Sequence, residues 1–324
     1  MIIEKALGFL ACPTCRKSLS YHITAESEHF TCNSCFTPFE IREGIPILTT
    51  DFNKYSSSQD KDFEVNFMTE EMKKSDYAGY DRGVYAALKE REYRELFNMT
   101  IPCPQNSRLL LDFGCGVGLS SIILGDYGYN IVGMDIVFEG LRQMKSILTT
   151  HDVEPFLVVG DGEHTPFLDN SFDVVFIGGV LHHFPDYTET LGECHRILKP
   201  HGQLIAIEPN RLDLPSTLKF ILWRKSGLQS INEDTLNPFR FMRKMKTLFH
   251  DTHLLYPGIN HTRYIKSDTP KKKVVAFLRD CFYAITPDAC SNQFFVATGV
   301  KNDINCSSML LPPMVGLIPQ DSPI

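Results

Sequence analysis

The sequence predicts an α/β fold in which a doubly wound, seven-stranded and mostly parallel sheet follows a small cysteine-rich ribbon. Two observations predict it. Two Cys-x-x-Cys pairs lie near the start of the chain, and from residue 108 onward short apolar runs alternate with helix-like stretches. Hydrophobic residues make up 43% of the 324 residues, which is enough to fill a substantial core. We therefore expect one large domain preceded by a small one.

The two cysteine knuckles, Cys12-Pro-Thr-Cys15 and Cys32-Asn-Ser-Cys35, are separated by 16 residues, a spacing typical of a four-cysteine zinc ribbon. Four thiolates satisfy a tetrahedral Zn²⁺ ion and leave no open position, so the predicted site is structural and not catalytic. Because so short a segment has little core of its own, metal binding would supply most of its folding free energy. The alternative is four unrelated buried cysteines.

The composition divides the chain into four parts. Residues 1–50 are the predicted zinc ribbon, and 51–106 combine a serine-rich linker with helices that cap the next part. The main domain spans 107–301 and includes a substrate lid at about 211–273. Residues 302–324 are expected to form a mobile tail.

The elements of the main domain follow from its apolar runs and helical periodicity. Strands are expected at 109–113, 130–134, 156–160, 172–177, 203–207 and 291–300, and helices at 82–97, 119–127, 139–149, 188–198 and 214–225. The last strand is expected to be antiparallel and to lie at the edge of the sheet. One more helix is expected to be capped by residues 232–235 and to run through Phe249.

A glycine loop follows the first strand of the domain. Asp112 ends that strand, and Gly114, Gly116 and Gly118 come directly after it. A dinucleotide site requires G-x-G-x-x-G, whereas an acid before the first glycine would repel a pyrophosphate. The same acid could hold the cationic aminoacyl end of S-adenosylmethionine, directly or through water. The glycines could instead only permit a tight turn, and Gly118 is the one most suited to helix packing.

Acidic residues also end the next two strands. Asp135 can accept hydrogen bonds from both ribose hydroxyls of a nucleoside, and Asp161, followed by Gly162, could accept one from the adenine amine. Since open α/β sheets bind ligands at the carboxyl ends of their strands, these acids are expected to meet at one site. The three acids favour a sulfonium nucleoside over a nicotinamide cofactor.

At this point the chain resembles the class I S-adenosylmethionine-dependent methyltransferases. Within them it is similar to the type 11 branch that contains the quinone-biosynthesis C-methyltransferases, through the stretch Leu181-His-His-Phe and the turn Leu198-Lys-Pro-His-Gly202. The resemblance spans 107–210 well and 211–300 loosely, and His201 departs from the glycine of the family's turn. It implies a Rossmann-like methyltransferase fold and a cofactor lined by Asp112, Gly114, Gly116, Asp135, Asp161 and Gly162.

The ribbon carries a second resemblance. Over residues 8–50, including the continuation at 39–48, it resembles the small zinc-ribbon proteins that activate tRNA and protein methyltransferases. Large-subunit rRNA guanine methyltransferases also join a zinc ribbon to this type of domain, but they complete their metal site with a histidine, and this ribbon has four cysteines.

His182 and His183 follow the fourth strand, where a methyl acceptor would lie. Methyl transfer from a sulfonium is an in-line displacement, and a base is needed only if the acceptor must lose a proton. We therefore expect one of these histidines either to deprotonate or to orient the acceptor, and the alternative is that they shape the loop.

The leading prediction for function is methyl transfer to an oxygen or carbon of a small hydrophobic metabolite. The first alternative is an rRNA or tRNA methyltransferase that acts on a purine ring nitrogen, because residues 211–273 carry 13 Lys and Arg against 5 Asp and Glu. The second is a non-catalytic, cofactor-binding scaffold. The segment 214–225 could cover an apolar substrate, lie on an anionic membrane surface, or pack on the sheet as a lid helix.

The whole-chain charge and the cysteine content bear on partners and compartment. A net charge of −7 argues against a protein that generally coats nucleic acid. The first residues lack the pattern of an export signal, and ten cysteines in a chain of this size are expected to be reduced thiols, which favours the cytoplasm. The sequence leaves the oligomeric state open.

Overall fold

The structure is a computed structural model. It describes residues 3–24, 27–49, 66, 69–70, 84–101, 104, 108–148, 153–225, 233–257 and 293–302. The predicted linker at 51–60, the tail from residue 303 and the lid residues 226–232 and 258–273 lie outside the described residues.

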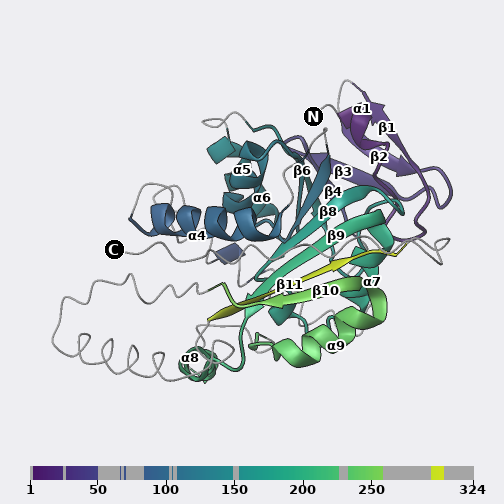
Figure 1. The fold of residues 1–324 in the computed structure, drawn as a ribbon. Helices are drawn as coiled ribbons and strands as arrows, with labels where there is room; N and C mark the ends of the chain where they lie inside the picture. Colours follow the sequence, from purple (N-terminus) through teal and green to yellow (C-terminus); the bar gives the residue numbers. More distant parts are fainter. Residues whose placement is uncertain are drawn as a thin grey trace.

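Within the described residues, the strands form one sheet of eleven in the order β1-β2-β3-β4-β7-β6-β5-β8-β9-β11-β10 (Figure 1). The strands are β1 (Leu19–Ile23), β2 (Glu28–Cys32), β3 (Pro38–Arg42), β4 (Ile45–Leu48), β5 (Leu109–Phe113), β6 (Asn130–Asp135), β7 (Phe156–Gly160), β8 (Phe172–Gly178), β9 (Leu198–Pro209), β10 (His250–Leu255) and β11 (Phe294–Val300). Neighbouring strands in the part β7-β6-β5-β8-β9 of this order are parallel. β11 is antiparallel to β9, and β10 is antiparallel to β11. The predicted α/β fold with a mostly parallel core is therefore confirmed.

Helices cover both faces of the parallel core, as a doubly wound sheet requires. On one face lie α4 (Val84–Thr100), α5 (Leu119–Asp126) and α6 (Phe138–Leu148), and their buried side chains pack on alternate residues of the strands. On the other face lie α7 (Thr188–Ile197) and α9 (Pro238–Leu248). The strands are buried on both faces, which is why they appear in the sequence as short continuous apolar runs.

The strand predicted at the edge of the sheet is not the edge strand. β11 is antiparallel as expected, but it lies between β9 and β10, and β10 forms the edge. The sequence of β10, His-Asp-Thr-His-Leu-Leu, has no apolar run, because its side chains alternate between half-buried and exposed. The sequence of β10 therefore had no pattern that distinguishes a strand from a loop. Residues 291 and 292 of the predicted last strand lie outside the described residues.

The structure shows the start of α9 and the conformation of His201. α9 begins at Pro238 and is capped by Asn237, whose Oδ1 accepts from the backbone N–H groups of Phe239 and Arg240, both at 3.0 Å. The predicted cap at 232–235 is thus wrong, since Pro at the first helical position after Asn is the stronger start signal. His201, which replaces a glycine of the family's turn, lies within the first residues of β9, has φ +61° and adopts the left-handed conformation that glycine favours.

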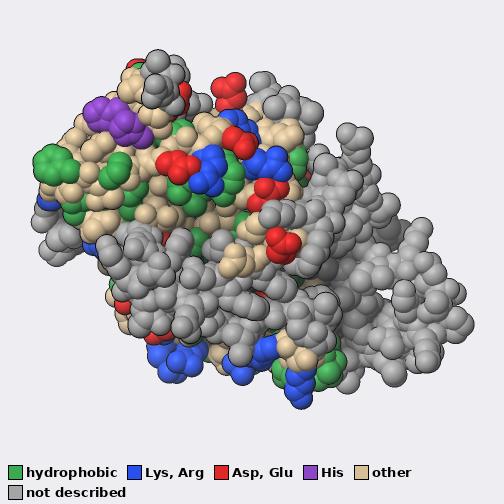
Figure 2. All heavy atoms as spheres, turned by 180° about the vertical axis from the view of Figure 1, so that it is seen from behind, with side chains coloured by type: hydrophobic (Ala, Val, Ile, Leu, Met, Phe, Trp, Pro, Cys, Tyr) green, Lys and Arg blue, Asp and Glu red, His purple; other side chains and the backbone are tan. Residues whose placement is uncertain are grey.

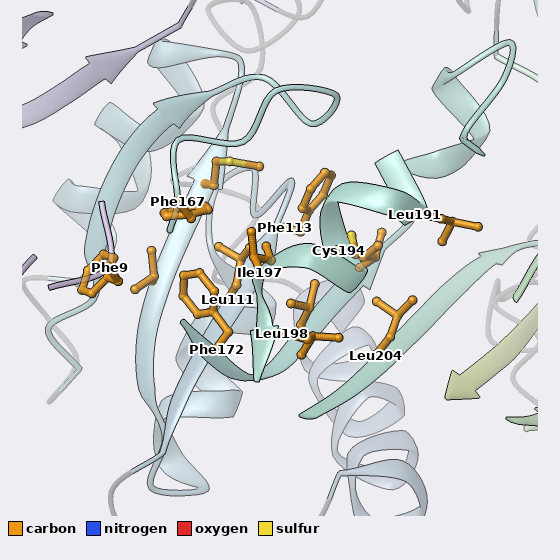
Figure 3. Close-up of a cluster of buried hydrophobic side chains, with 14 of the residues drawn as sticks. Phe9, Leu111, Phe113, Phe167, Phe172, Leu191, Cys194, Ile197, Leu198 and Leu204 are labelled. Carbon is orange, nitrogen blue, oxygen red and sulfur yellow. The ribbon is translucent and has the colours of Figure 1, made fainter. Parts of the chain in front are cut away.

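The ribbon strands extend the same sheet. β1 to β4 pair antiparallel with one another, and β4 then pairs parallel with β7, with Ile47 opposite Val159 and Leu48 opposite Gly160. The segment before β1 begins with α1 (Ile3–Ala6) and packs Phe9 into the core. Figure 3 shows this side chain beside Phe167 and Phe172, with ring centroids 6.3 and 6.0 Å away. The N-terminal residues are therefore part of the main hydrophobic core.

Candidate functional site

The three glycines of the loop between β5 and α5 have different surroundings, so each position needs a glycine for a different reason. Gly114, Gly116 and Gly118 all have positive φ, at +70°, +53° and +89°. A Cβ on Gly114 would lie 2.3 Å from Cγ2 of Val180, and one on Gly118 would lie 2.5 Å from Cγ of Met144 in α6. A Cβ on Gly116 would meet nothing within 4 Å. Gly114 and Gly118 thus allow close packing, whereas Gly116 faces open space that a ligand could fill.

Asp112 lies beneath this loop. Its carboxyl group is 1% exposed, and its Oδ2 accepts hydrogen bonds from the hydroxyl groups of Ser120 at 2.7 Å and Ser121 at 2.5 Å. Burial raises the pKa of Asp112 to about 6, although the two serine hydrogen bonds act in the opposite direction. The side chain therefore fixes the first turn of α5 against the end of β5.

Asp135, at the end of β6, holds the loop from the other side. Its Oδ2 accepts from the backbone N–H of Gly116 at 2.8 Å, and its Oδ1 accepts from that of Val137 at 2.8 Å. Burial raises the pKa of Asp135, while these backbone bonds and the nearby His183 lower it. The structure therefore brings together Gly116, Asp135 and His183, three residues that the sequence placed on three different elements.

Asp161 and Gly162 follow β7. Asp161 is buried, and its Oδ1 accepts from the backbone N–H of Glu163 at 3.0 Å, which shapes the turn after the strand. A Cβ on Gly162 would lie 2.6 Å from Cζ of Phe113 and 3.2 Å from Cζ of Phe184. These contacts put the third acidic turn beside the end of β5 and the loop that follows β8, as expected for one edge of a parallel sheet.

His182 lies in the 3₁₀ helix η2 (Leu181–His183), directly after β8. The side chain is buried, with Nδ1 3.0 Å from Oε2 of Glu208 and Nε2 3.6 Å from Oε1 of Glu233. Burial alone would lower its pKa, but the hydrogen bonds with the two carboxylates outweigh burial and raise the pKa to about 9. The two carboxylates therefore flank the imidazole ring, one beside each of its nitrogens. The half-buried ring of His183 lies tilted against it, with centroids 4.2 Å apart and an angle of 38° between the ring planes.

Glu208 is one of the site residues that the sequence analysis missed. It is the last residue but one of β9, is 0% exposed, and accepts from the backbone N–H groups of Val180 at 3.0 Å, Leu181 at 2.8 Å and His182 at 3.3 Å. It thus fixes both the start of η2 and the imidazole ring. The signal was available, since the acid stands at the carboxyl end of a parallel strand exactly as Asp112, Asp135 and Asp161 do.

The segment that carries Glu233 closes over η2. The backbone N–H of Asp234 donates to the carbonyl of His182 at 3.1 Å, and that of Leu236 donates to the carbonyl of Pro209 at 2.9 Å. α8 (Leu214–Lys225) precedes this segment, and its Phe220 meets the His182 ring edge-on with centroids 6.0 Å apart. Part of the predicted lid therefore lies against the histidine pair.

The four ribbon cysteines converge at the other end of the sheet. Sγ of Cys12 lies 3.6 Å from that of Cys35, and Sγ of Cys15 lies 3.4 Å from that of Cys32 and 3.7 Å from that of Cys35. All four sulfurs lie within 4.8 Å of one another. Close convergence of four thiols from two knuckles is the donor set that a tetrahedral Zn²⁺ ion takes.

Comparison with known proteins assigns the chain to a family. The methyltransferase-domain family Methyltransf_11 matches residues 111–206. The chain is 30% identical over 182 residues to the demethylmenaquinone methyltransferase of Listeria welshimeri, a match that covers 50% of this chain and 74% of that protein. The chain belongs to the class I S-adenosylmethionine-dependent methyltransferases. This methyltransferase is also 33% identical over 130 residues to the 2-methyl-6-phytyl-1,4-hydroquinone methyltransferase of Synechocystis, a match that spans 40% of each chain.

The fold agrees with that assignment. A solved S-adenosylmethionine-dependent methyltransferase from Thermotoga maritima superposes with a TM-score of 0.52 at 15% identity, covering 74% of this chain and all of that one. The similarity in sequence shows that the methyltransferase is an enzyme that uses S-adenosylmethionine, and the alternative of a non-catalytic scaffold is withdrawn. The open space at Gly116 and the acids around it fit this cofactor. No helix among the described residues is both long and apolar enough to cross a membrane.

Proposed function

We propose that the methyltransferase transfers the methyl group of S-adenosylmethionine to an oxygen or carbon of a small hydrophobic acceptor of the quinone or hydroquinone type. The observation that carries this proposal is the similarity to the Listeria protein, which extends over 74% of that protein and so beyond the cofactor-binding residues alone. The curated relatives named above methylate demethylmenaquinone and a phytylhydroquinone. Phe220 packs edge-on against His182, so an apolar ring is accommodated beside this histidine, and this supports an acceptor that carries such a ring.

In this proposal one set of residues binds the cofactor and another orients the acceptor. When bound, the cofactor supplies an electrophilic methyl group on a sulfonium. In this proposal Gly116 leaves room for the nucleoside, and Asp135 accepts hydrogen bonds from its ribose. Asp161 and Gly162 form the turn expected beside the adenine, while Asp112, Gly114 and Gly118 hold the loop. Of the two roles expected for the histidine pair, we propose orientation of the acceptor, because both ring nitrogens of His182 already face carboxylates.

We further propose that Cys12, Cys15, Cys32 and Cys35 bind one structural Zn²⁺ ion. Zn–S bonds of about 2.3 Å in a tetrahedron place the sulfurs about 3.8 Å apart. The three short Sγ–Sγ distances of 3.4 to 3.7 Å are close to that value. The ion would fix a part of the chain whose strands are four or five residues long.

The acceptor is proposed to arrive from an anionic lipid surface through α8. One face of this helix packs inward through Ser216 and Phe220, and the opposite face exposes Leu214, Leu218 and Leu222 by 62%, 58% and 56%. Arg224 and Lys225 end the helix, and Figure 2 shows Lys and Arg side chains along the lower edge, where α8 and α9 lie. An exposed apolar stripe beside cations is the arrangement by which a helix binds an anionic membrane surface.

The proposed acceptor is tested by isotope transfer. The purified enzyme and labelled S-adenosylmethionine are incubated in parallel with a lipid extract that contains reduced quinones and with total RNA, and the products are analysed by mass spectrometry. The expected result is label on a quinol, with S-adenosylhomocysteine binding measured in parallel. Label on RNA alone, with binding that falls steeply as salt is raised, would instead support the RNA alternative.

The membrane contact is tested with vesicles. We expect Leu218→Glu with Leu222→Glu to lower partition into anionic vesicles at least tenfold, because two charges replace apolar contacts in the lipid interface. The matched control is Ile23→Glu, which changes a side chain that is 67% exposed on β1, in the ribbon. Equal partition of the double variant and the control would contradict the contact.

A further inference from the structure

Three metal-ligating side chains outside the ribbon converge next to the site. A ring nitrogen of His182, a ring nitrogen of His183 and a carboxylate oxygen of Glu233 lie within 4.8 Å of one another. Nε2 of His182 is 3.6 Å from Oε1 of Glu233. Two imidazoles and one carboxylate are a recognised ligand set for a divalent transition metal that keeps open coordination positions.

Glu208 supplies the support that such a site requires. A histidine that binds a metal almost always gives its other ring N–H to a carboxylate, a backbone carbonyl or a water molecule, which fixes the tautomer and the direction of the ring. Here Nδ1 of His182 is 3.0 Å from Oε2 of Glu208, so Nε2 is directed at Glu233. Glu208 is itself locked by backbone N–H groups of Val180 and Leu181. The ring is therefore oriented before any ion binds.

The third ligand is also held in place. Glu233 belongs to the segment that the Asp234 and Leu236 backbone bonds attach to η2 and to the end of β9. Two buried or nearly buried carboxylates, Glu208 and Glu233, flank one imidazole. A dication is the charge that this arrangement accommodates, because each carboxylate loses hydration on burial and gains from a nearby positive charge.

We propose that His182, His183 and Glu233 bind a divalent transition-metal ion, with an open position for an oxygen of the methyl acceptor. The proposal rests on the proposed function in its last clause only, since an acceptor of the quinol class carries the oxygen. A metal ion there would act as a template that orients the acceptor and as a Lewis acid on its oxygen. It would also explain why both histidines lie under part of the lid.

Metal binding can be measured without donor or acceptor. Co²⁺ is titrated into the full chain, purified with its ribbon metal in place, and bound cobalt is counted by equilibrium dialysis and followed by its visible spectrum. We expect one Co²⁺ per chain, with no sulfur-to-cobalt band, because the ligands are nitrogen and oxygen. Glu233→Gln and His183→Gln are each expected to weaken binding at least tenfold, and Glu208→Gln by a similar factor through the lost support.

The matched control is His253→Gln, which changes a histidine that contacts only an exposed acid, Asp251 at 3.0 Å, among the interactions described for it. Its cobalt affinity should equal that of the unaltered chain. No bound Co²⁺, or equal affinity in all four variants, would overturn the inference. Methyl transfer is assayed separately with and without chelator: bound cobalt without transfer to any quinol would contradict the proposed acceptor and leave the metal site standing.

Discussion

The candidate sites at the two ends of the sheet are built in different ways. At the ribbon end, four identical side chains converge from two knuckles, and the strands around them are short and half-exposed. At the cofactor end, geometry comes from glycines that lack side chains and from buried acids that hold backbone N–H groups. In our proposal the first region depends on a metal for its order, whereas the second is ordered by the packing of the core beneath it. Changes in each region should therefore differ in size and in what restores them.

The largest expected effect is loss of a ribbon cysteine. Cys32→Ala should release the metal and remove most of the folding free energy of the ribbon, on the order of 10 kcal/mol for a structural zinc site. The loss should extend to the main domain, because β4 pairs with β7 and Phe9 lies in its core. Thermal unfolding and zinc content are the measurements.

Cys194→Ala is the matched control, since Cys194 is also fully buried but lies on α7, away from the other thiols. It should cost only about 1 kcal/mol and leave the zinc content unchanged. Equal destabilisation by the two variants would show that the ribbon does not depend on a metal.

The next effect concerns the acid at the end of β9. Glu208→Gln should lower the free energy of unfolding by about 3 to 5 kcal/mol, because it breaks a fully buried charge pair and turns an amide donor toward backbone N–H groups. Urea unfolding measures the loss. Glu233→Gln, at the other nitrogen of the same imidazole but partly exposed, should cost clearly less; the reverse order would contradict the supporting role of Glu208.

A smaller contrast lies within the glycine loop. Gly114→Ala combines left-handed strain of about 1 to 2 kcal/mol with a contact 2.3 Å from Val180, so it should destabilise the fold. Gly116→Ala should cause only the backbone strain, without a clash, but its methyl group would fill the open space. It should therefore weaken S-adenosylhomocysteine binding at least tenfold. Calorimetry with unfolding curves separates the two. If Gly116→Ala binds the nucleoside as the unaltered chain does, that space is not the cofactor's.

The smallest effect is on pH dependence at an exposed ion pair. Asp186 accepts a hydrogen bond from Nζ of Lys244 at 2.6 Å, and this contact, with Thr188, lowers its pKa to about 2 from the ordinary value of 3.8. Its stabilisation is therefore present above pH 4 and lost as the pH falls toward 2. Because the side chain is 70% exposed, Asp186→Asn should cost at most about 1 kcal/mol at neutral pH. Acid unfolding midpoints should move little between the two proteins; a loss of several kcal/mol would contradict a solvent-screened pair.

The sequence predicted what depends on local pattern. The acids at residues 112, 135 and 161 follow apolar runs, and those runs proved to be neighbouring strands in one parallel core. The roles of Asp112, Asp135 and Asp161 toward the cofactor stay predictions. The cysteines were found because residue type and spacing alone define a knuckle, and their metal also stays a prediction.

What could not be predicted depends on contacts between distant residues. The pairing of β4 with β7 places Leu48 opposite Gly160, and neither strand has a sequence pattern that predicts which strand it pairs with. The link from Glu208 to His182 spans 26 residues and crosses between strand ends. β10 had no apolar run to reveal it, because only one of its faces is covered. Tertiary packing, which periodicity does not encode, decided each of these.

The pairing of β4 with β7 has a consequence for how this enzyme can be divided. Without the ribbon, β7 would present a bare row of backbone N–H and C=O groups, and an open apolar strand of that kind promotes association between chains. The ribbon moves the boundary of the sheet to β1, which is short and partly polar. A catalytic fragment that begins after the ribbon should therefore aggregate, because the ribbon covers this edge of the sheet whether or not it binds the proposed metal.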